Sequence, residues 1–335
     1  MTRPRFITGA VFAASCGAAL AAQQTAQPSF RSGAPTVAVY ATVTDAQGRL
    51  VPDLGRDAFT VDDNGTPQPL TLFANDIQPI TVVMLLDRSG SMKPNFALEQ
   101  MAAEAFVASM GPKDKARIGS FSKSIQVDPP EFTSDYGEMM KILQTKLQSD
   151  GPTPLWNAVN TGIDDLLLEQ GRRVVLVFTD GVDEPMNFTG RNKSLKDVMK
   201  RAEENDVMVY AIGLAGDTGS PAGRAPLGRG AVGPGAFGGF GGRGMAVRPQ
   251  LQQPDEGLPK IAAATGGGYF ELTSANNLVG TFTRVADELH HQYALGFTPA
   301  KLDGKMHDLA IRLSRTDLRA RARKRYLATP ARSTP

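Results

Sequence analysis

The chain has 335 residues, which is enough for about two domains and a well-buried core. Its 36 basic and 34 acidic residues leave a formal net charge of +2, so bulk charge points to no particular partner and a nucleic-acid partner is not expected. Hydrophobic residues make up 41% and charged residues 21%, as in a soluble globular chain, while 35 glycines and 23 prolines indicate long loops or a flexible insert.

The N-terminus has the pattern of an export signal. Two arginines within the first five residues precede an apolar run at residues 6–20, which is too short to span a bilayer securely. Residues 19–21 fit a cleavage site, so residues 1–21 are predicted to be a signal peptide that directs the chain to the periplasm, the cell surface or the medium. A lipoprotein signal, with Cys16 acylated and kept, is the alternative. No other stretch approaches the roughly 20 apolar residues of a transmembrane helix.

Short runs of β-branched and alternating residues predict strands near both ends of the chain. Asp63-Asn64-Gly65 is a strong hairpin signal, and we expect residues 70–73 to form the strand that returns from it. We predict a small β-sandwich-like module that combines residues 22–78 with residues 292–328 and leaves residues 329–335 as a tail. Its predicted strands are 36–44, 59–62, 70–73, 293–297, 309–313 and 319–327.

The middle of the chain, residues 79–291, alternates buried strands with helices. Continuous apolar runs predict strands that are buried on both faces, and apolar residues at helical spacing lie between them. The alternation predicts an α/β domain with a doubly wound, mostly parallel sheet, inserted between the two halves of the β-module. Residues 215–257, rich in glycine, proline and alanine, are predicted to be a disordered insert. The predicted strands are 81–86, 116–121, 172–180, 207–213 and 269–272, and the predicted helices are 96–110, 137–147, 153–168, 195–205, 258–265 and 278–290.

A cluster of oxygen-bearing side chains follows the first of these buried strands. Asp87, Ser89 and Ser91 lie on one short loop, and Gly90 allows that loop to fold tightly. The loop falls at the carboxyl end of the strand, where open α/β sheets place their ligand crevice. Because hydroxyl and carboxylate oxygens are ligands for hard cations, the loop predicts a site for a divalent cation.

The pattern Asp87-x-Ser89-x-Ser91 resembles the metal-ion-dependent adhesion site (MIDAS) of von Willebrand factor type A (vWA) domains. Thr153 lies in a segment similar to the threonine loop of that site, and Asp180 lies in a segment similar to its last element, an aspartate after a central strand. The resemblance covers residues 80–291 without the insert. It implies Mg²⁺, with Mn²⁺ and Ca²⁺ as alternatives, and an open coordination position for a carboxylate of a protein partner. The implied ligands are Ser89, Ser91 and Thr153, joined directly or through waters by Asp87 and Asp180.

Each piece of this pattern also fits a purely structural role. An aspartate at a strand end, such as Asp87 or Asp180, is commonly a turn or helix-capping residue. Thr153 before Pro154 suits the start of a helix. The metal site is favoured because independent caps have no reason to reproduce the order of the family's elements. The β-strand flanks and the ending at residues 321–326 further resemble an exported bacterial family of vWA-related proteins reported from Acidobacteria.

Two further groups of side chains are candidate contact residues. Four residues that follow the ligand loops are candidates for contacting a partner: Leu155, Trp156, Asp183 and Glu184. Trp156 also suits a core position. Four arginines alternate along a predicted strand and would share one face of it: Arg319, Arg321, Arg323 and Arg325. A solvated edge strand protected by charge explains this face, and a patch for anionic lipid, polysaccharide or nucleic acid is the alternative.

The leading functional hypothesis is an exported, metal-dependent protein-binding or adhesion module that captures an acidic group of its partner. A non-catalytic scaffold or accessory subunit of an exported complex is the alternative. A Mg²⁺-dependent phosphotransfer hydrolase is less favoured, because enzymes that form an aspartyl phosphate use a second aspartate where this chain has Ser89. The three histidines lie in the last helix and the C-terminal strands, and no Gly-x-Ser-x-Gly elbow is present. We therefore predict no enzymatic activity.

Overall fold

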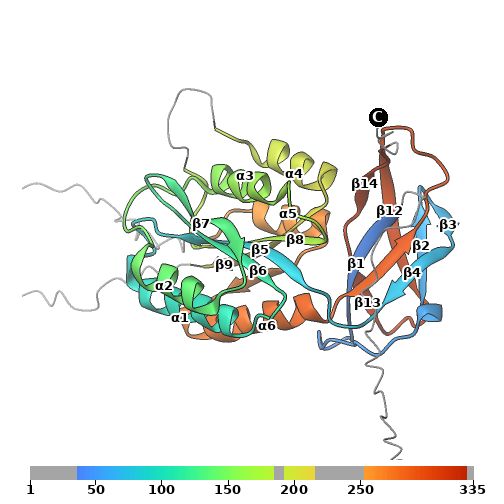
Figure 1. Ribbon diagram of the computed structural model, residues 1–335, viewed down its shortest axis with the longest axis horizontal. Coiled ribbons are helices and arrows are strands. Elements are labelled where there is room, and N and C mark those ends of the chain that lie inside the picture. Colours follow the sequence, from blue (N-terminus) through green and yellow to red (C-terminus); the bar gives the residue numbers. More distant parts are fainter. Residues whose placement is uncertain (1–35, 185–191, 216–252, 330–335) are drawn as a thin grey trace, which may run out of the picture.

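The computed structural model describes residues 36–184, 192–215 and 253–329. These residues form an α/β domain and a β-sandwich that lie side by side (Figure 1). The predictions for the signal peptide, Cys16, most of the insert and the end of the tail lie outside the described residues. Among the helices of the described ranges, none is long and apolar enough to cross a membrane.

The α/β domain is built on a mostly parallel sheet, which has six strands in the described part of the chain. In spatial order they are β10 (Tyr269–Leu272), β9 (Val207–Leu214), β8 (Arg172–Thr179), β5 (Ile80–Asp87), β6 (Lys115–Phe121) and β7 (Ile125–Thr133). Only β7, at one edge, is antiparallel to its neighbour in this set. This strand was not predicted, because Pro129 and Pro130 interrupt its pattern, and prolines are tolerated on an edge strand.

Helices cover both faces of this sheet (Figure 1). One face carries α1 (Phe96–Ala108), α2 (Tyr136–Thr145) and α6 (Leu278–His290), and the other carries α3 (Leu155–Leu166), α4 (Leu195–Glu204) and α5 (Gly257–Thr265). The central strand β5 is buried along its whole length, because its alternate side chains pack into the two layers. The predicted α/β class and doubly wound sheet are therefore confirmed.

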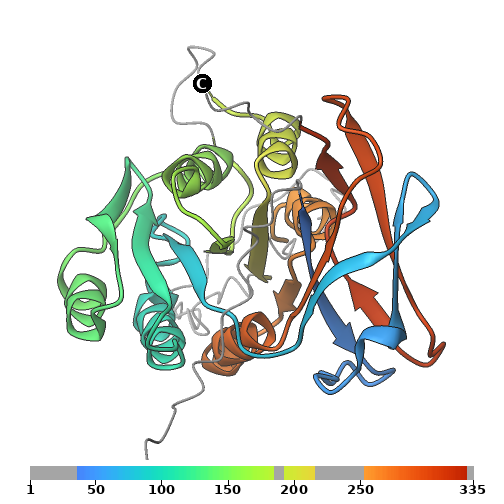
Figure 2. The ribbon, with the colours of Figure 1, turned by 45° about the vertical axis from the view of Figure 1, so that its right-hand side comes forward.

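The β-sandwich is assembled from segments near both ends of the described chain (Figure 2). One sheet has the order β13 (Arg319–Arg321), β1 (Val37–Thr44), β11 (Tyr293–Phe297) and β4 (Leu70–Ala74). The other has the order β14 (Arg325–Leu327), β12 (Met306–Leu313), β2 (Phe59–Asp63) and β3 (Thr66–Gln68). Apolar side chains of both sheets, including Val39, Val61 and Tyr293, form one core between them. The limits of the two units at residues 79 and 291 stay a prediction.

Two strand predictions were wrong. The strand that returns from the Asn64–Gly65 turn is β3, whereas residues 70–73 form part of β4 in the opposite sheet. Pro69 separates the two strands and lacks the N–H that a continuous ladder would need. Residues 319–327 are not one strand, because β13 pairs with β1 and β14 pairs with β12. Between β13 and β14 the chain passes from one sheet to the other, and there the Lys324 N–H donates to the Ala264 carbonyl at the end of α5 (3.1 Å).

The β-sandwich packs against the α/β domain at the amino ends of the parallel strands (Figure 1). Arg172, the first residue of β8, donates to Gln292 Oε1 (3.1 Å), and Gln292 Nε2 donates to Thr42 Oγ1 in β1 (3.0 Å). All three side chains are buried. Because the junction lies at the amino ends, the carboxyl ends of the strands point away from the sandwich.

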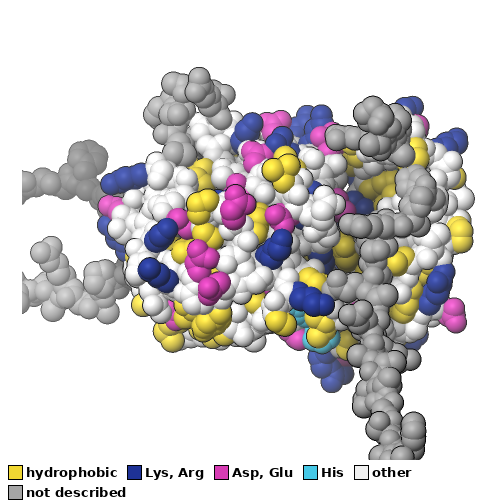
Figure 3. Space-filling view, in the orientation of Figure 1, with side chains coloured by type: hydrophobic (Ala, Val, Ile, Leu, Met, Phe, Trp, Pro, Cys, Tyr) yellow, Lys and Arg dark blue, Asp and Glu magenta, His cyan; other side chains and the backbone are white. Residues whose placement is uncertain are grey.

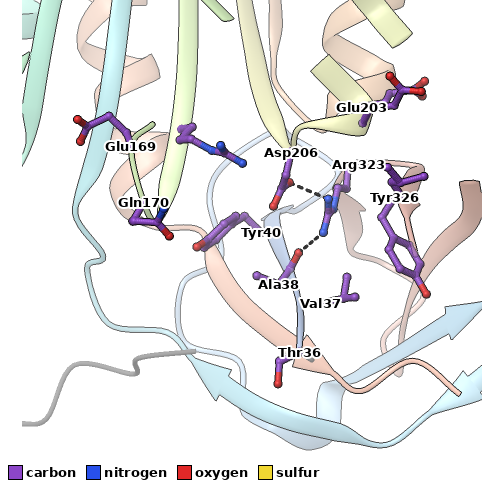
Figure 4. Close-up of a pocket in the computed structure, with 14 residues that line it drawn as sticks. Thr36, Val37, Ala38, Tyr40, Glu169, Gln170, Glu203, Asp206, Arg323 and Tyr326 are labelled. Atoms are coloured by element: carbon purple, nitrogen blue, oxygen red, sulfur yellow. Dashed lines mark hydrogen bonds and ion pairs between the residues drawn. The ribbon is translucent and has the colours of Figure 1, made fainter. Parts of the chain in front are cut away.

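A cleft of about 400 Å³ lies along this junction (Figure 4). Asp206, between α4 and β9, forms an ion pair of 2.8 Å with Arg323, and Arg323 also donates to the Ala38 carbonyl of β1. Figure 4 shows these three residues at one wall of the cleft, with Tyr40 beside them. The ion pair therefore ties the two parts of the molecule together.

Candidate metal centre

Three loops meet at the carboxyl end of the parallel sheet. They follow β5, precede α3 and follow β8, and we call them the serine loop (residues 87–92), the threonine loop (residues 148–154) and the aspartate loop (residues 179–184). The Gly90 N–H donates to the Gly151 carbonyl (3.1 Å), and the Asp150 N–H donates to the Arg88 carbonyl (2.9 Å). The Glu184 N–H donates to the Thr153 carbonyl (2.8 Å). Backbone hydrogen bonds thus hold together three loops that are far apart in sequence.

The side chains of the serine loop face the aspartate loop. Ser91 Oγ donates to Asp180 Oδ1 (2.8 Å) and lies 3.2 Å from Ser89 Oγ. Asp87 Oδ1 accepts the Ser89 N–H (2.8 Å), and its other oxygen accepts the Thr179 hydroxyl. Both oxygens of Asp87 are therefore hydrogen-bonded within the loops, so this residue orients the serine loop.

Thr153 lies against the aspartate loop. A Cβ atom added to Gly181 would be 3.2 Å from Thr153 Oγ1, so glycine at this position leaves room for the hydroxyl. Thr153 is buried, whereas Ser91 and Gly90 are exposed. The structure therefore brings the predicted residues of all three loops to one place, with an opening to solvent at the serine loop.

The two aspartates of the site carry unusual electrostatics. Burial raises the pKa of Asp87 from 3.8 to about 6, although hydrogen bonds from Thr179 and Ser89 act in the opposite direction. Burial also raises the pKa of Asp180. No basic side chain in the described ranges forms an ion pair with either carboxylate. A bound cation would offset both negative charges.

The donor set fits a hard cation. In the part of the chain that the structure describes, no three His, Cys, Asp or Glu side chains converge in a metal-binding geometry. The site instead offers hydroxyls together with two carboxylates, and oxygen ligands of this kind suit Mg²⁺, Mn²⁺ or Ca²⁺ better than a soft metal. The residues present therefore fit the cation that the sequence pattern implies.

Sequence reasoning missed the residues that support the serine loop from behind. Arg88 forms an ion pair with Glu99 of α1 at 3.0 Å, and both side chains are buried. Burial raises the pKa of Glu99 well above its usual range, against the effect of the Arg88 charge. Gln148 joins the threonine loop to β6, because its Nε2 donates to the Ser120 carbonyl (2.9 Å). No spacing or motif in the sequence marks these contacts.

The candidate partner contacts are divided by the structure. The prediction that Leu155 and Trp156 contact a partner is wrong, because both are residues of α3 whose side chains are buried in the core. Asp183 is half-buried and accepts the Trp156 N–H (3.1 Å), which fixes the aspartate loop. Glu184 is exposed at the rim of the site, next to the half-exposed Val182. Glu184 remains a candidate contact, and Val182 joins it.

The four arginines do not share one exposed face. They are divided between two sheets and the segment between them, and only Arg319 and Arg325 of the four are exposed. Arg321 donates to Glu288 and to the Tyr210 hydroxyl (3.1 Å) in the α/β domain. Arg323 pairs with Asp206. The prediction of a single basic face is therefore wrong, because two of the four arginines join the sandwich to the α/β domain.

The chain is similar to several known proteins. Residues 81–229 match the family model of the von Willebrand factor type A domain. A von Willebrand factor type A protein from Catenulispora acidiphila is 11% identical, with 89% of this chain and 75% of that chain covered and a TM-score of 0.47. An aerotolerance-related membrane protein from Bacteroides fragilis is 17% identical, with coverages of 62% and 99% and a TM-score of 0.42.

A third solved structure contains a metal. Proximal thread matrix protein 1 from the mussel byssus, solved with a zinc-occupied MIDAS motif, is 16% identical, with coverages of 67% and 48% and a TM-score of 0.45. A search of the curated proteins gives no match. The family match spans Asp87, Ser89, Ser91, Thr153 and Asp180. The region of this chain that carries the three loops therefore matches the model of the von Willebrand factor type A domain.

Proposed function

We propose that the three loops bind a divalent cation, Mg²⁺ in the first place, with Mn²⁺ and Ca²⁺ as alternatives. Ser89, Ser91 and Thr153 would supply hydroxyl ligands, and Asp87 and Asp180 would act directly or through waters. The observation that carries the proposal is the convergence of these oxygens around two buried carboxylates that lack a basic partner among the described residues. When bound, the cation supplies a positive, Lewis-acidic centre at the mouth of the site.

We further propose that this chain is exported and that its site captures a carboxylate of a protein partner. The exposed Gly90 and Ser91 of the serine loop, with Glu184 and Val182 at the rim, offer an open face at the end of the domain that points away from the sandwich. On the face shown in Figure 3, basic and acidic side chains are interspersed, which does not favour a nucleic-acid partner. The N-terminal export pattern supports a partner outside the cytoplasm.

The surroundings of the loops support a non-enzymatic role. Hydrolytic chemistry at this site would need a general base or a second nucleophile, and Ser89 occupies the position of the second aspartate in aspartyl-phosphate enzymes. His290 is hydrogen-bonded to Asp114 (2.7 Å) and His307 to Asp63 (2.8 Å), in the supporting parts of the fold. We therefore propose binding without catalysis.

Thermal unfolding of the purified chain tests the cation site. With Mg²⁺ at about 100 times its Kd, binding adds about 2.7 kcal/mol to the free energy of unfolding. For a chain of 335 residues we expect Tm to rise by about 4 °C, and EDTA should reverse the rise. Mn²⁺, Ca²⁺ and Zn²⁺ are measured in parallel, Zn²⁺ because the mussel protein holds it. A Tm that none of these ions changes at millimolar concentration would refute the proposal.

The partner chemistry is tested with matched peptides. Short peptides that each carry one Asp or Glu are compared with their Asn or Gln counterparts for binding to the immobilised chain, in Mg²⁺ and in EDTA. We expect binding that needs both the carboxylate and Mg²⁺. A natural partner that binds equally in EDTA would instead favour the scaffold role, with the β-sandwich as the contact surface.

A further inference from the structure

Arg88 is a buried residue between the predicted ligands Asp87 and Ser89, and its side chain points away from the site. Its Nε donates to the Gln148 carbonyl of the threonine loop (2.8 Å), and its NH1 pairs with Glu99 Oε2 (3.0 Å). The guanidinium carbon lies 3.5 Å from the ring centroid of Phe96. One side chain therefore joins the serine loop, the threonine loop and the first turn of α1.

The backbone of Arg88 adds two further links. Its N–H donates to the Phe121 carbonyl at the end of β6 (3.0 Å), and its carbonyl accepts the Asp150 N–H (2.9 Å). With the Gln148 contact, this residue contributes two of the hydrogen bonds between the serine and threonine loops. The position of Ser89 and Ser91 relative to Thr153 therefore depends on Arg88.

Stability alone does not explain the Arg88–Glu99 pair. The side chain of Glu99 is fully buried, and among the described residues its second oxygen, Oε1, has no hydrogen-bond partner. A buried ion pair loses its hydration on both members, and apolar residues of similar size often give equal or greater stability. A fixed geometry is the use for which a buried charged pair is best suited, because the guanidinium fork bonds two groups at once.

We propose that Arg88, held in place by Glu99, is the positioning residue of the cation site. It keeps the serine hydroxyls at the correct distance from the threonine loop, and Glu99 prevents its side chain from leaving that position. The inference rests on the proposed cation binding and adds the device that determines its affinity. Removing supporting residues behind metal ligands typically weakens metal affinity by about 10- to 100-fold.

The test replaces the pair by apolar residues of similar size, Arg88→Met with Glu99→Leu, in the full chain. A matched control is the pair Arg117 and Asp165, which joins β6 to α3 at 2.9 Å and is mostly buried. Arg117 also donates to the Pro129 and Val127 carbonyls, so the control removes similar contacts away from the loops. The Kd for Mg²⁺ is measured by calorimetry, and Tm is measured in EDTA.

We expect the R88M/E99L variant to keep its Tm in EDTA within a few degrees of wild type while its Kd for Mg²⁺ rises by about 10- to 100-fold. The Arg117→Met and Asp165→Leu control should keep the wild-type Kd. A wild-type Kd in R88M/E99L would overturn the inference while leaving the cation site intact. Absence of Mg²⁺ binding in the wild type would instead overturn the proposed function.

A second variant decides the question if the double variant does not fold. Arg88→Lys keeps a positive charge opposite Glu99, but a single ammonium group cannot reproduce the fork that reaches both Glu99 and Gln148. We expect this variant to fold and to bind Mg²⁺ at least several-fold more weakly than wild type. An unchanged Kd in Arg88→Lys would refute the positioning role.

Discussion

Asp87→Asn is expected to stabilise the metal-free protein and to abolish its response to Mg²⁺. Burial raises the pKa of Asp87 from 3.8 to about 6, so the folded state resists the ionisation of this carboxyl. At neutral pH the ionised carboxyl therefore lowers the free energy of unfolding by about 3 kcal/mol, at about 1.4 kcal/mol per pKa unit. Asparagine is neutral and can keep a hydrogen bond to the Ser89 N–H. The variant should therefore have the higher Tm in EDTA, and wild type should gain stability from Mg²⁺ that the variant cannot gain.

The pH dependence gives this prediction its sign. Well below pH 3.8, Asp87 is protonated in both the folded and the unfolded chain, so it does not lower stability there. As pH rises from 3.8 to about 6, the unfolded chain loses this proton more readily, and wild-type stability falls. The difference in the free energy of unfolding between Asp87→Asn and wild type should grow across this window and stay constant above it. Urea unfolding at several pH values in EDTA measures it.

Asp114→Asn is the matched control for a buried aspartate with the opposite electrostatics. Although burial acts to raise it, the pKa of Asp114 is lowered by hydrogen bonds from His290 and from the Ile80 and Gly111 N–H groups. Its charge therefore stabilises the fold at neutral pH, and Asp114→Asn should lower the free energy of unfolding. If both substitutions destabilise the metal-free protein alike, the account of Asp87 as a strained, cation-ready carboxylate is wrong.

The parallel sheet and the ligand loops could be predicted from the sequence, because both have recognisable local sequence patterns. A continuous apolar run such as residues 81–86 has few alternatives to a buried strand, and the polar residues after it must then lie at the strand's carboxyl end. Asp180 could be placed beside that loop because it follows a second apolar strand. Thr153 could be placed there because it lies just before a predicted helix. Family resemblance supplied their order and the cation.

The misplaced features depend on contacts between distant segments. Residues 70–73 have a strand pattern, but which sheet they join depends on the break at Pro69 and on the partner strand β11. The alternating arginines fit an exposed edge, yet Arg321 and Arg323 meet Glu288 and Asp206 of the other part. Glu99 would be assigned to solvent by its charge, and only the tertiary position of Arg88 explains its burial. Contacts between residues that are far apart in the sequence leave no local sequence pattern from which they could be predicted.

Gly266→Ala is expected to destabilise the protein strongly by disturbing the contact between α5 and the sandwich. Gly266 ends α5 with a φ of +82°, and a Cβ atom there would lie 2.3 Å from the Arg323 backbone nitrogen and 2.6 Å from the Ala322 carbonyl carbon. Left-handed backbone costs an alanine roughly 1–2 kcal/mol, and forcing apart a packed contact adds about 1–3 kcal/mol. We expect a loss of about 3 kcal/mol in the free energy of unfolding, measured in guanidinium chloride.

Gly304→Ala separates the two causes of that loss. Gly304 has a similar φ of +73°, but a Cβ atom there would meet nothing within 4 Å. This control should show only the backbone cost of roughly 1–2 kcal/mol. Because the sandwich contacts the domain at the amino ends of the strands, folded Gly266→Ala protein should keep the wild-type Kd for Mg²⁺. Equal losses in the two variants would mean that residues 322–323 do not rest on the end of α5 in solution, and a changed Kd would show that the sandwich acts on the cation site across the sheet.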